Sequence, residues 1–253
     1  MELRGAVIVI TGGGRGIGAA LARRFAREQP AGIVVGDLDG EAAGRVAGEV
    51  GGVGLAVDVR REEDTIRLIE AAREAFGPVD LFCANAGIAM EGGLDLDDGS
   101  WQRSWEVNTL AHLHAARHLV PEWRVRGGGY LLVTASAAGL LTSPGSAVYA
   151  VTKHAVVALA EWIAITHGDA GVRVSCLCPQ GVRTDMLDAT GRLGDMLRPG
   201  AIEPEEVADL VVEGLSDERF LILPHPEVAE YERRRAGDRD RWLAGMRKAL
   251  SGR

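Results

Sequence analysis

This sequence of 253 residues has no excess of positive charge: its formal net charge is −8 and its pI is near 5.3. An acidic chain presents no electrostatic footprint for a phosphate backbone or an anionic lipid surface. No long apolar run opens the chain: the first, residues 6–10, is far too short to span a bilayer and lacks a signal peptide's cleavage region. We therefore expect a cytoplasmic protein with neither nucleic acid nor a membrane as partner.

Cysteine is also scarce, with Cys83, Cys176 and Cys178 each in an apolar stretch typical of a strand. An odd number of such residues predicts reduced core thiols rather than disulfides. The Cys-x-Cys pair shares one face of its strand but has no further ligands nearby, and structural zinc needs four. His114 and His118 lie one helical turn apart without a third ligand, which favours solvated or interface histidines. No metal site is expected.

No composition break, internal repeat or low-complexity segment divides the chain, so residues 1–253 are expected to form one domain. Short apolar, β-branched runs alternate with longer helical patterns, which predicts a doubly wound (Rossmann-type) α/β fold with a mostly parallel seven-stranded sheet and helices on both faces. The predicted strands are residues 6–11, 33–37, 53–59, 79–85, 130–135, 172–179 and 220–223. The predicted helices are residues 16–28, 41–49, 62–76, 99–126, 147–168 and 204–216.

Two segments interrupt this alternation. Residues 180–200 form a long connection after the sixth predicted strand, and long loops in compact domains are usually functional or mobile. We expect residues 185–200 to be a substrate loop. Residues 225–253 form a C-terminal extension in which Trp242, Met246 and Leu250 make a helical stripe. We expect this stripe to pack on its own domain or across a subunit contact.

The stretch VITGGGRGIG, residues 9–18, places glycines where the first strand passes into a helix. A helix N-terminus offers unpaired N–H groups and a partial positive charge, so the natural occupant of such a turn is a pyrophosphate. Any Cβ would push that group away. The spacing fits Gly14-x-Gly16-x-x-Ala19 or Thr11-Gly12-x-x-x-Gly16-x-Gly18, and the second fits better because it starts at the strand's end.

An acidic residue about 20 positions further on can accept hydrogen bonds from the adenosine ribose of a dinucleotide. Asp37 lies there, at the end of the second predicted strand. Its carboxylate would repel a 2′-phosphate, which favours NAD over NADP. Arg15 argues the other way, because a guanidinium inside the glycine turn could pair with that phosphate. We favour NAD, since Arg15 can swing to solvent or pair with Asp37.

Tyr149 and Lys153 are four residues apart in a predicted helix, so they share a face. Bringing a phenol from its usual pKa near 10 to about 7 or 8 takes roughly 3 to 4 kcal/mol. One ammonium about 4 Å away, at an effective dielectric near 20, supplies about that much. A tyrosine tuned in this way can take a proton from an alcohol or return it. Lys153 and Lys248 are the only lysines, which makes a chance pairing less plausible.

Residues 5–215 resemble the short-chain dehydrogenase/reductase family in its single-domain form. The matching motifs are Thr11-Gly12-x-x-x-Gly16-Ile17-Gly18, Asp58 in LAVD, Asn85-Ala86-Gly87, Asn108 in VNT, Ser136 in VTASAAG and Tyr149-x-x-x-Lys153. The resemblance implies that Tyr149 is the general acid/base and that Lys153 tunes it and anchors the ribose. It also implies that Ser136 holds the substrate oxygen and that Asn108 positions a water on the proton path.

Contacts with the cofactor follow from the same resemblance. They are expected at Gly12, Arg15, Gly16, Ile17, Gly18, Asp37, Leu38, Asp58, Val59, Asn85, Ala86, Gly87, Tyr149, Lys153, Pro179, Val182 and Thr184. Asn85 lies in a turn and can serve the backbone more than the ligand. The family often has Pro-Gly after the sixth strand, whereas here Gln180 follows Pro179 and can project into the substrate pocket.

The sequence therefore predicts an NAD-dependent enzyme that interconverts a secondary alcohol and a ketone. Substrate contacts are expected at Ser136, Gln180, Met186 and Leu187, and an apolar loop that includes Leu193, Met196 and Leu197 favours a lipophilic substrate. The resemblance implies a homodimer or homotetramer built on the fourth and fifth helices. An NADP-dependent carbonyl reductase of the same family, a non-catalytic dinucleotide-binding regulator and a methyltransferase on a similar sheet remain as alternatives.

Overall fold

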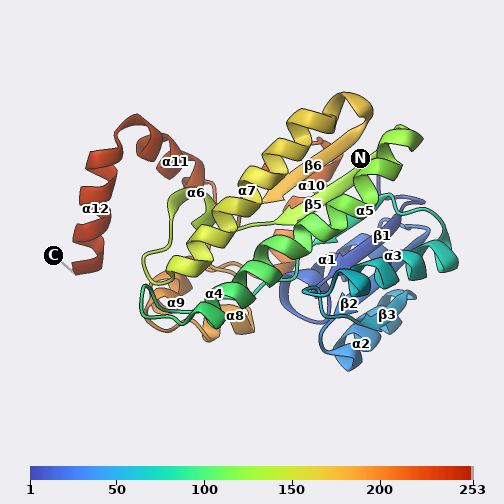
Figure 1. Ribbon diagram of the computed structural model, residues 1–253, viewed down its shortest axis with the longest axis horizontal. Coiled ribbons are helices and arrows are strands. Elements are labelled where there is room, and N and C mark those ends of the chain that lie inside the picture. The colour runs from blue at the N-terminus through green and yellow to red at the C-terminus, as the bar shows by residue number, and fades with distance from the viewer. Residues whose placement is uncertain (252–253) are drawn as a thin grey trace.

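A parallel sheet of seven strands forms the centre of the computed structural model, which describes residues 1–251 except the side chains of Arg192 and Leu193 (Figure 1). Every strand pair is parallel, and the order is β3-β2-β1-β4-β5-β6-β7. The strands are β1 (Val7–Thr11), β2 (Gly32–Asp37), β3 (Val53–Ala56), β4 (Leu81–Ala84), β5 (Gly129–Thr134), β6 (Val172–Leu177) and β7 (Leu221–Ile222). The predicted fold class is confirmed, with a sheet that is wholly parallel.

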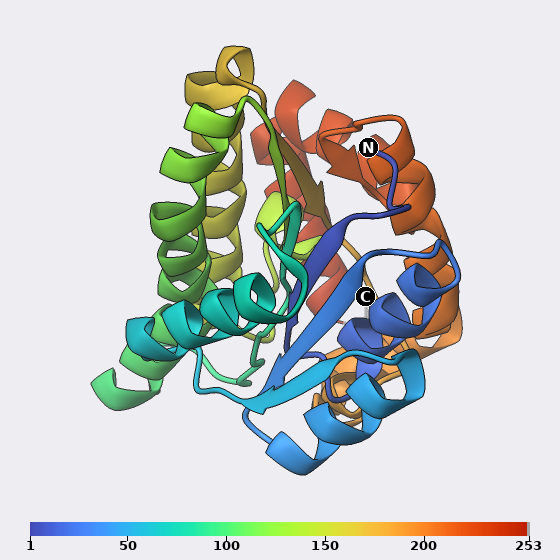
Figure 2. The same cartoon turned by 90° about the vertical axis from the view of Figure 1, so that its right-hand side faces the viewer.

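Helices cover both faces of this sheet, as Figure 2 shows. On one face lie α3 (Glu62–Phe76), α5 (Ala111–Arg126) and α7 (Ala147–His167), and on the other lie α1 (Gly16–Ala26), α2 (Gly40–Val50) and α10 (Pro204–Ser216). The shorter elements are α4 (Asp98–Trp105), the π-helical turn η1 (Glu106–Leu110), α6 (Ala138–Leu141), α8 (Asp185–Asp188), α9 (Gly191–Leu197), α11 (Glu227–Gly237) and α12 (Arg239–Ser251).

The central strands β1, β4 and β5 are largely apolar because both of their faces are buried. In β1, Val7 and Val9 join the core cluster around Trp123, whereas Ile8 and Ile10 join the cluster around Phe25 on the opposite face. Successive side chains of a strand point to opposite sides, so a strand between two helical layers has no polar face. The continuous apolar runs of the sequence are explained in this way.

The segment from Ala147 to Ala170 is long and apolar enough to cross a membrane by length and composition. In this fold it contains α7, which packs against β6 and α5, and 44% of its most apolar window is buried inside the molecule. Residues on one side of the helix, Val156, Ala160 and Ile163, belong to the core. The apolar composition therefore belongs to a core helix of the sheet.

Two predicted elements differ from the structure near the carboxyl edge of the sheet. The predicted strand 53–59 ends at Ala56, and the Val57 N–H makes the last bond to β2, at the Asp37 carbonyl. The predicted helix 99–126 is interrupted by η1, which holds Asn108. Such π-turns are frequent at functional sites.

The strand order leaves a crevice between β1 and β4, where successive connections begin to run to the opposite side of the sheet. From β1, the connection through α1 leads to β2 on one side, whereas β4 lies on the other. In open parallel sheets, ligands bind at the carboxyl ends of the strands at this point. The glycine turn after β1 and the residues after β4 therefore face the same crevice.

Candidate active site

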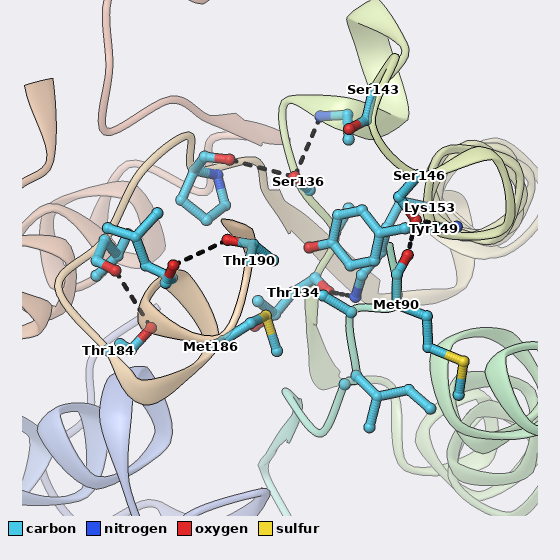
Figure 3. Close-up of a pocket in the computed structure, with 18 of the residues that line it drawn as sticks. Met90, Thr134, Ser136, Ser143, Ser146, Tyr149, Lys153, Thr184, Met186 and Thr190 are labelled. Carbon is cyan, nitrogen blue, oxygen red and sulfur yellow. Dashed lines mark hydrogen bonds between the residues drawn. The ribbon is translucent and has the colours of Figure 1, made fainter. Parts of the chain in front are cut away.

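One cavity of about 1180 Å³ opens along the carboxyl edge of the sheet. The glycine turn, the residues that follow β2 to β6, the first turn of α7 and the segment α8–α9 all line it. In Figure 3, Ser136, Tyr149, Lys153, Thr184 and Met186 gather around its interior. Most of the residues that the sequence selects therefore meet in a single space.

The glycine turn approaches its neighbours too closely for side chains. Gly12 and Gly16 have φ of +62° and +52°, a region that favours glycine. A Cβ on Gly12 would lie 2.8 Å from the Ala86 Cα. One on Gly18 would lie 2.2 Å from the Gly12 carbonyl oxygen. The predicted cofactor contact of Gly18 is not found at the cavity wall, because this glycine packs α1 beneath the turn while Gly12, Arg15, Gly16 and Ile17 line the cavity.

Asp37 is held at the end of β2 by the backbone beside the glycine turn. Its Oδ2 accepts the Gly14 N–H at 2.9 Å and its Oδ1 accepts the Asp39 N–H at 3.0 Å. Only 8% of the residue is exposed, and it lines the cavity together with Leu38. A carboxylate fixed in this way presents negative charge to the adenosine end of a dinucleotide.

Of the two arrangements considered from the sequence, Arg15 adopts the solvent-exposed one and does not pair with Asp37. Its Nη1 lies 3.6 Å from Asp185 Oδ2 at the start of α8, and both side chains are more than 70% exposed. An exposed pair of this kind contributes little to stability. Arg15 therefore stands at the rim of the cavity, away from Asp37.

Asp58 and Val59 line the cavity after β3, together with Val57 and Arg60. The Arg60 Nη2 donates to Asp58 Oδ2 at 2.5 Å, and this bond lowers the pKa of the Asp58 carboxyl. The carboxylate stays charged at neutral pH beside its guanidinium partner. Val57 and Arg60 had no distinguishing signal in the sequence.

Asn85 mainly serves the backbone, as its place in a turn allowed. Its Nδ2 donates to the carbonyls of Thr11 and Gly12 at 3.1 and 3.2 Å, and its Oδ1 accepts from Thr134 Oγ1 at 3.1 Å. Asn85 thus ties the glycine turn to β4 and β5. Together with Ala86 and Gly87, it also lines the cavity.

Tyr149 lies in the first turn of α7, which Ser146 caps by accepting the Tyr149 N–H at 3.3 Å. The Ser146 hydroxyl in turn donates to the Met90 carbonyl, which fixes this end of the helix. Ser136 follows β5, and its Oγ accepts the Ala138 N–H at 3.1 Å and donates to the Pro179 carbonyl at 3.4 Å. The two hydroxyls line the same part of the cavity, and the Ser136 side chain acts to lower the pKa of Tyr149.

Lys153 is buried, with only 2% of its surface exposed. Its Nζ donates to the Thr134 carbonyl at 2.8 Å and lies 5.8 Å from the centroid of the Tyr149 ring. Burial lowers the pKa of Lys153 to about 8, so the amine still carries a proton at pH 7. The side chain therefore brings a poorly solvated cation to the cavity wall.

The prediction that the Lys153 ammonium, with a cationic nicotinamide adding to it, brings the Tyr149 pKa to 7 or 8 concerns the site with its cofactor and stays a prediction. Among the protein's own groups, burial raises the pKa of Tyr149 above its usual value, and the Ser136 side chain opposes that rise only in part. The Lys153 ammonium directs its own hydrogen bond at the Thr134 carbonyl. The protein's own groups therefore keep this phenol protonated.

Asn108 is fully buried in η1 and is not part of the cavity wall. Its Oδ1 accepts the Ile88 N–H at 2.8 Å, and its Nδ2 donates to the Ile88 carbonyl at 2.9 Å and to Thr152 Oγ1 at 3.2 Å. A Cβ on Gly87 would lie 3.4 Å from Asn108 Oδ1 and 3.3 Å from Lys153 Nζ. Asn108 thus lies close to the lysine and braces the loop after β4.

The residues after β6 reach the cavity in the predicted order. Pro179, Gln180, Val182, Thr184, Met186 and Leu187 all line it. The Gln180 N–H donates to Nδ1 of the buried His225 at 3.1 Å, which joins this loop to the C-terminal extension. Thr184 Oγ1 donates to the Val182 carbonyl at 3.2 Å. The side chain of Leu193 lies outside what the structure describes.

Sequence reasoning missed the part of the wall that comes from the C-terminal extension. Tyr231, Trp242, Met246, Ala249 and Leu250 line the same cavity as Tyr149. Their helical stripe was visible in the sequence but was assigned to packing. Sequence reasoning also missed Thr134, Ile88 and Met90. Each contributes a backbone carbonyl, which every residue type has, so the sequence gives no sign of it.

The three cysteines are buried free thiols, as predicted. Cys176 Sγ lies 3.7 Å from Cys178 Sγ, and this contact together with burial raises the pKa of the Cys176 thiol. His118 Nε2 lies 2.9 Å from Glu62 Oε1 on α3. Among residues 1–251, no three His, Cys, Asp or Glu side chains come together as a metal site would require.

Two observations indicate that the cavity fits a nicotinamide dinucleotide. The turn at Gly12 and Gly16 leaves bare backbone at the N-terminus of α1, where a pyrophosphate binds. The carboxylate of Asp37 stands at the end of β2, where the ribose of such a cofactor is held.

Comparisons with known proteins agree with this geometry. Residues 6–192 match the family model for short chain dehydrogenase. A 1-deoxy-11-beta-hydroxypentalenate dehydrogenase of Streptomyces exfoliatus is 37% identical over 241 residues, which are 90% of this chain and 86% of that protein. A 3beta-hydroxysteroid dehydrogenase 2 of Eggerthella lenta is 34% identical over 73% of this chain and 74% of that protein.

Comparison with a solved structure also indicates this family. A short chain dehydrogenase/reductase from Burkholderia phymatum, crystallised in complex with NAD, has a TM-score of 0.87 and 31% identity, and the match covers 95% of this chain and 96% of that one. The fold, the NAD-binding crevice and the residues around Tyr149 therefore have one explanation: the chain belongs to the short-chain dehydrogenase/reductase family and is an oxidoreductase that acts on CH–OH groups.

Proposed function

We propose that this protein is an NAD-dependent dehydrogenase that interconverts a secondary alcohol and a ketone. One observation carries the proposal: Ser136, Tyr149 and the buried ammonium of Lys153 line the same cavity as the glycine turn and Asp37. This places two hydroxyls and a cation beside the space where a dinucleotide would lie. A hydroxyl group of a small substrate fits between them.

The preference for NAD over NADP rests on Asp37. Its two oxygens already accept backbone N–H groups at 2.9 and 3.0 Å, so the carboxylate cannot turn away from a 2′-phosphate without losing both bonds. Arg15, the one residue that argued for NADP, pairs instead with Asp185 at the rim. Gly12, Gly16, Ile17, Leu38, Asp58 and Thr184 would hold the remainder of the cofactor.

In this proposal a bound nicotinamide supplies the acceptor for the hydride that leaves the alcohol carbon. Ser136 donates a hydrogen bond to the substrate oxygen, and Tyr149 takes the hydroxyl proton as general base. Because burial raises the pKa of Tyr149, proton transfer needs a cation that stabilises the phenolate, and Lys153 supplies one. Asn108 is proposed to act on the proton path. It lies near Lys153, and its side chain holds the Ile88 loop in place.

The substrate is proposed to be lipophilic. Apolar side chains line the cavity at Met186, Leu187, Met196 and Leu197, and Gln180 lines it as well. The two relatives named above are dehydrogenases of a hydroxypentalenate and of a hydroxysteroid, both of which are ring-bearing alcohols. Ring-bearing secondary alcohols are therefore the first compounds to assay.

We also propose a homodimer or homotetramer in the cytoplasm. Val151, Trp162 and Ile165 on α7 are 50%, 57% and 84% exposed, and large apolar side chains of this kind are typical of protein–protein interfaces. Sedimentation equilibrium of the purified protein tests the oligomeric state, and a monomer at micromolar concentration would refute it.

The test follows the absorbance band of reduced nicotinamide while the protein is mixed with NAD or NADP and a panel of secondary alcohols. Tyr149→Phe is expected to lose at least about 100-fold in kcat, a typical contribution of general acid–base catalysis. Tyr130→Phe is the matched control, because the Tyr130 hydroxyl bonds to Ser175 and lies away from the cavity. A Tyr149→Phe variant that keeps most of its turnover would refute the mechanism.

Other outcomes identify the alternatives. Equal or better use of NADP would favour the NADP-dependent carbonyl reductase. Failure to turn over any alcohol with either cofactor would refute the proposed reaction.

A further inference from the structure

The two C-terminal helices form one wall of the cavity that contains Tyr149. Tyr231 on α11 and Trp242, Met246, Ala249 and Leu250 on α12 line it. Figure 1 shows α11 beside α6 and α12 as an arm that stands apart from the sheet. The family's glycine turn, catalytic residues and sheet do not require this arm, so its place at the cavity needs its own explanation.

The base of the arm is fixed to the catalytic part of the same chain. Val228 is fully buried in the core around β5 and α7. The buried His225 accepts the Gln180 N–H at 3.1 Å, and Arg235 Nη2 lies 3.4 Å from Nε2 of His154, the residue after Lys153. The position of α11 is thus set by residues on either side of the site.

The second helix of the arm has one apolar face, and that face is turned to the cavity. Trp242, Met246 and Leu250 follow one another at intervals of four residues, which places them on one side of α12. The Trp242 ring is tilted against Tyr231 with 6.2 Å between their centroids, which connects α12 to α11. Arg247 and Lys248, on the remaining surface of the helix, are exposed.

We propose that this face of α12 is the subsite for the uncharged ring system of the substrate, on the side away from the hydroxyl that reacts. The inference rests on the proposed function and extends it to a substrate class. None of the α12 residues that line the cavity is charged, so the subsite selects apolar bulk. Small-molecule sites typically enclose about 300 to 1,000 Å³. The cavity of about 1180 Å³ leaves room for a bulky substrate beside the cofactor.

The substrate is a better occupant of this face than a second copy of the chain. Trp242 and Met246 share one continuous cavity with Ser136 and Tyr149, which an interface between subunits would not require. Met186 and Met196, on the segment α8–α9, line the same cavity with further apolar surface. A flat polycyclic molecule between these two apolar walls would place its hydroxyl at Tyr149.

The experiment compares kcat/KM for cyclohexanol, a decalol and a 3-hydroxysteroid with NAD in wild type, Trp242→Ala and Met246→Ala. We expect both variants to lose about tenfold or more on the steroid and less than about twofold on cyclohexanol, since only the larger substrate reaches the arm. Leu243→Ala is the matched control, because Leu243 is an apolar residue of the same helix, 47% exposed and not part of the cavity wall. The Leu243→Ala variant is expected to change kcat/KM for neither cyclohexanol nor the steroid.

A binding measurement separates this inference from the proposed function. Tryptophan fluorescence of the wild type is titrated with the steroid, and the same titration of Trp242→Phe gives the share that belongs to Trp242. A quench specific to Trp242 supports the subsite even if no alcohol is oxidised, and its absence overturns the subsite.

Two further results would also overturn it. One is an equal effect of Trp242→Ala on small and large alcohols, including no effect on either. The other is a lower oligomeric state of Trp242→Ala in sedimentation, without a change in substrate size preference, because α12 would then pack against a second copy.

Discussion

The buried ammonium of Lys153 should make the candidate site a source of instability, and its replacement by methionine tests this. Lys153 is 2% exposed, and burial lowers its pKa from 10.5 to about 8. At one pKa unit per 1.36 kcal/mol, keeping the proton in the folded state costs about 3 kcal/mol at pH 7. Removing the amine also removes its bond to the Thr134 carbonyl, worth about 1 kcal/mol. The net expectation is a gain of about 2 kcal/mol.

The pH dependence gives this prediction its sign. Between pH 8 and 10.5 the unfolded chain still binds the Lys153 proton while the folded chain has released it, so the stability of the wild type rises with pH across this range. The advantage of Lys153→Met therefore falls as the pH rises from 7 to 10. In a chain of 253 residues, 1 kcal/mol moves Tm by about 2 to 4 °C, so the gain at pH 7 is about 4 to 8 °C.

The assay is thermal unfolding of cofactor-free protein at pH 7 and pH 10, followed by circular dichroism. Cofactor must be removed because a ligand that binds only the folded state raises Tm by itself. Lys248→Met, which changes the other lysine of the chain on the exposed surface of α12, is the control and should shift Tm little at either pH. A Lys153→Met protein that melts below the wild type at pH 7, or whose gain is the same at both pH values, would refute the reasoning.

Two further predictions concern the cofactor side of the cavity. Asp37→Ser should raise the ratio of kcat/KM for NADP to that for NAD by about tenfold or more, since a carboxylate no longer faces the 2′-phosphate; steady-state kinetics with both cofactors measure it. Gly18→Ala should destabilise the protein by about 3 kcal/mol in urea unfolding, because its Cβ would lie 2.2 Å from the Gly12 oxygen. Gly44→Ala, at an open position of α2, should instead stabilise it by up to about 1 kcal/mol. Equal effects of the two alanines would contradict the packing account.

Local signals predicted those parts of the fold that local physics determines. The helices at residues 62–76 and 204–216 were predicted to the residue, since acidic first turns and, in the second, Pro204 mark their starts. A mostly parallel sheet was predicted from the continuous apolar runs, and the structure shows that every strand pair is parallel. Strand ends were predicted less well, because where the pairing stops depends on the neighbouring strand: β3 pairs with β2 only as far as Ala56, and Val57 beyond it lines the cavity.

The site was predictable as a set of side chains but not as a set of interactions. Helical spacing paired Tyr149 with Lys153, and the family resemblance implied that Ser136 joins them; in the structure all three line one cavity. The sequence did not show that the Lys153 ammonium bonds to the Thr134 carbonyl, nor that burial would dominate the Tyr149 pKa. Hydrogen bonds to backbone carbonyls and desolvation arise from the packed structure.

The C-terminal arm shows the same limit at a larger scale. The stripe of Trp242, Met246 and Leu250 identified an amphipathic helix, but periodicity does not say what an apolar face will contact. The answer depends on Val228 and His225, which anchor α11 between the core and the loop that contains Gln180. The backbone N–H of Gln180 donates to His225, so the loop after β6 is joined to the base of the arm by a hydrogen bond. Substrate selectivity in this chain should therefore respond to changes in either segment, whereas the chemistry at Tyr149 should not.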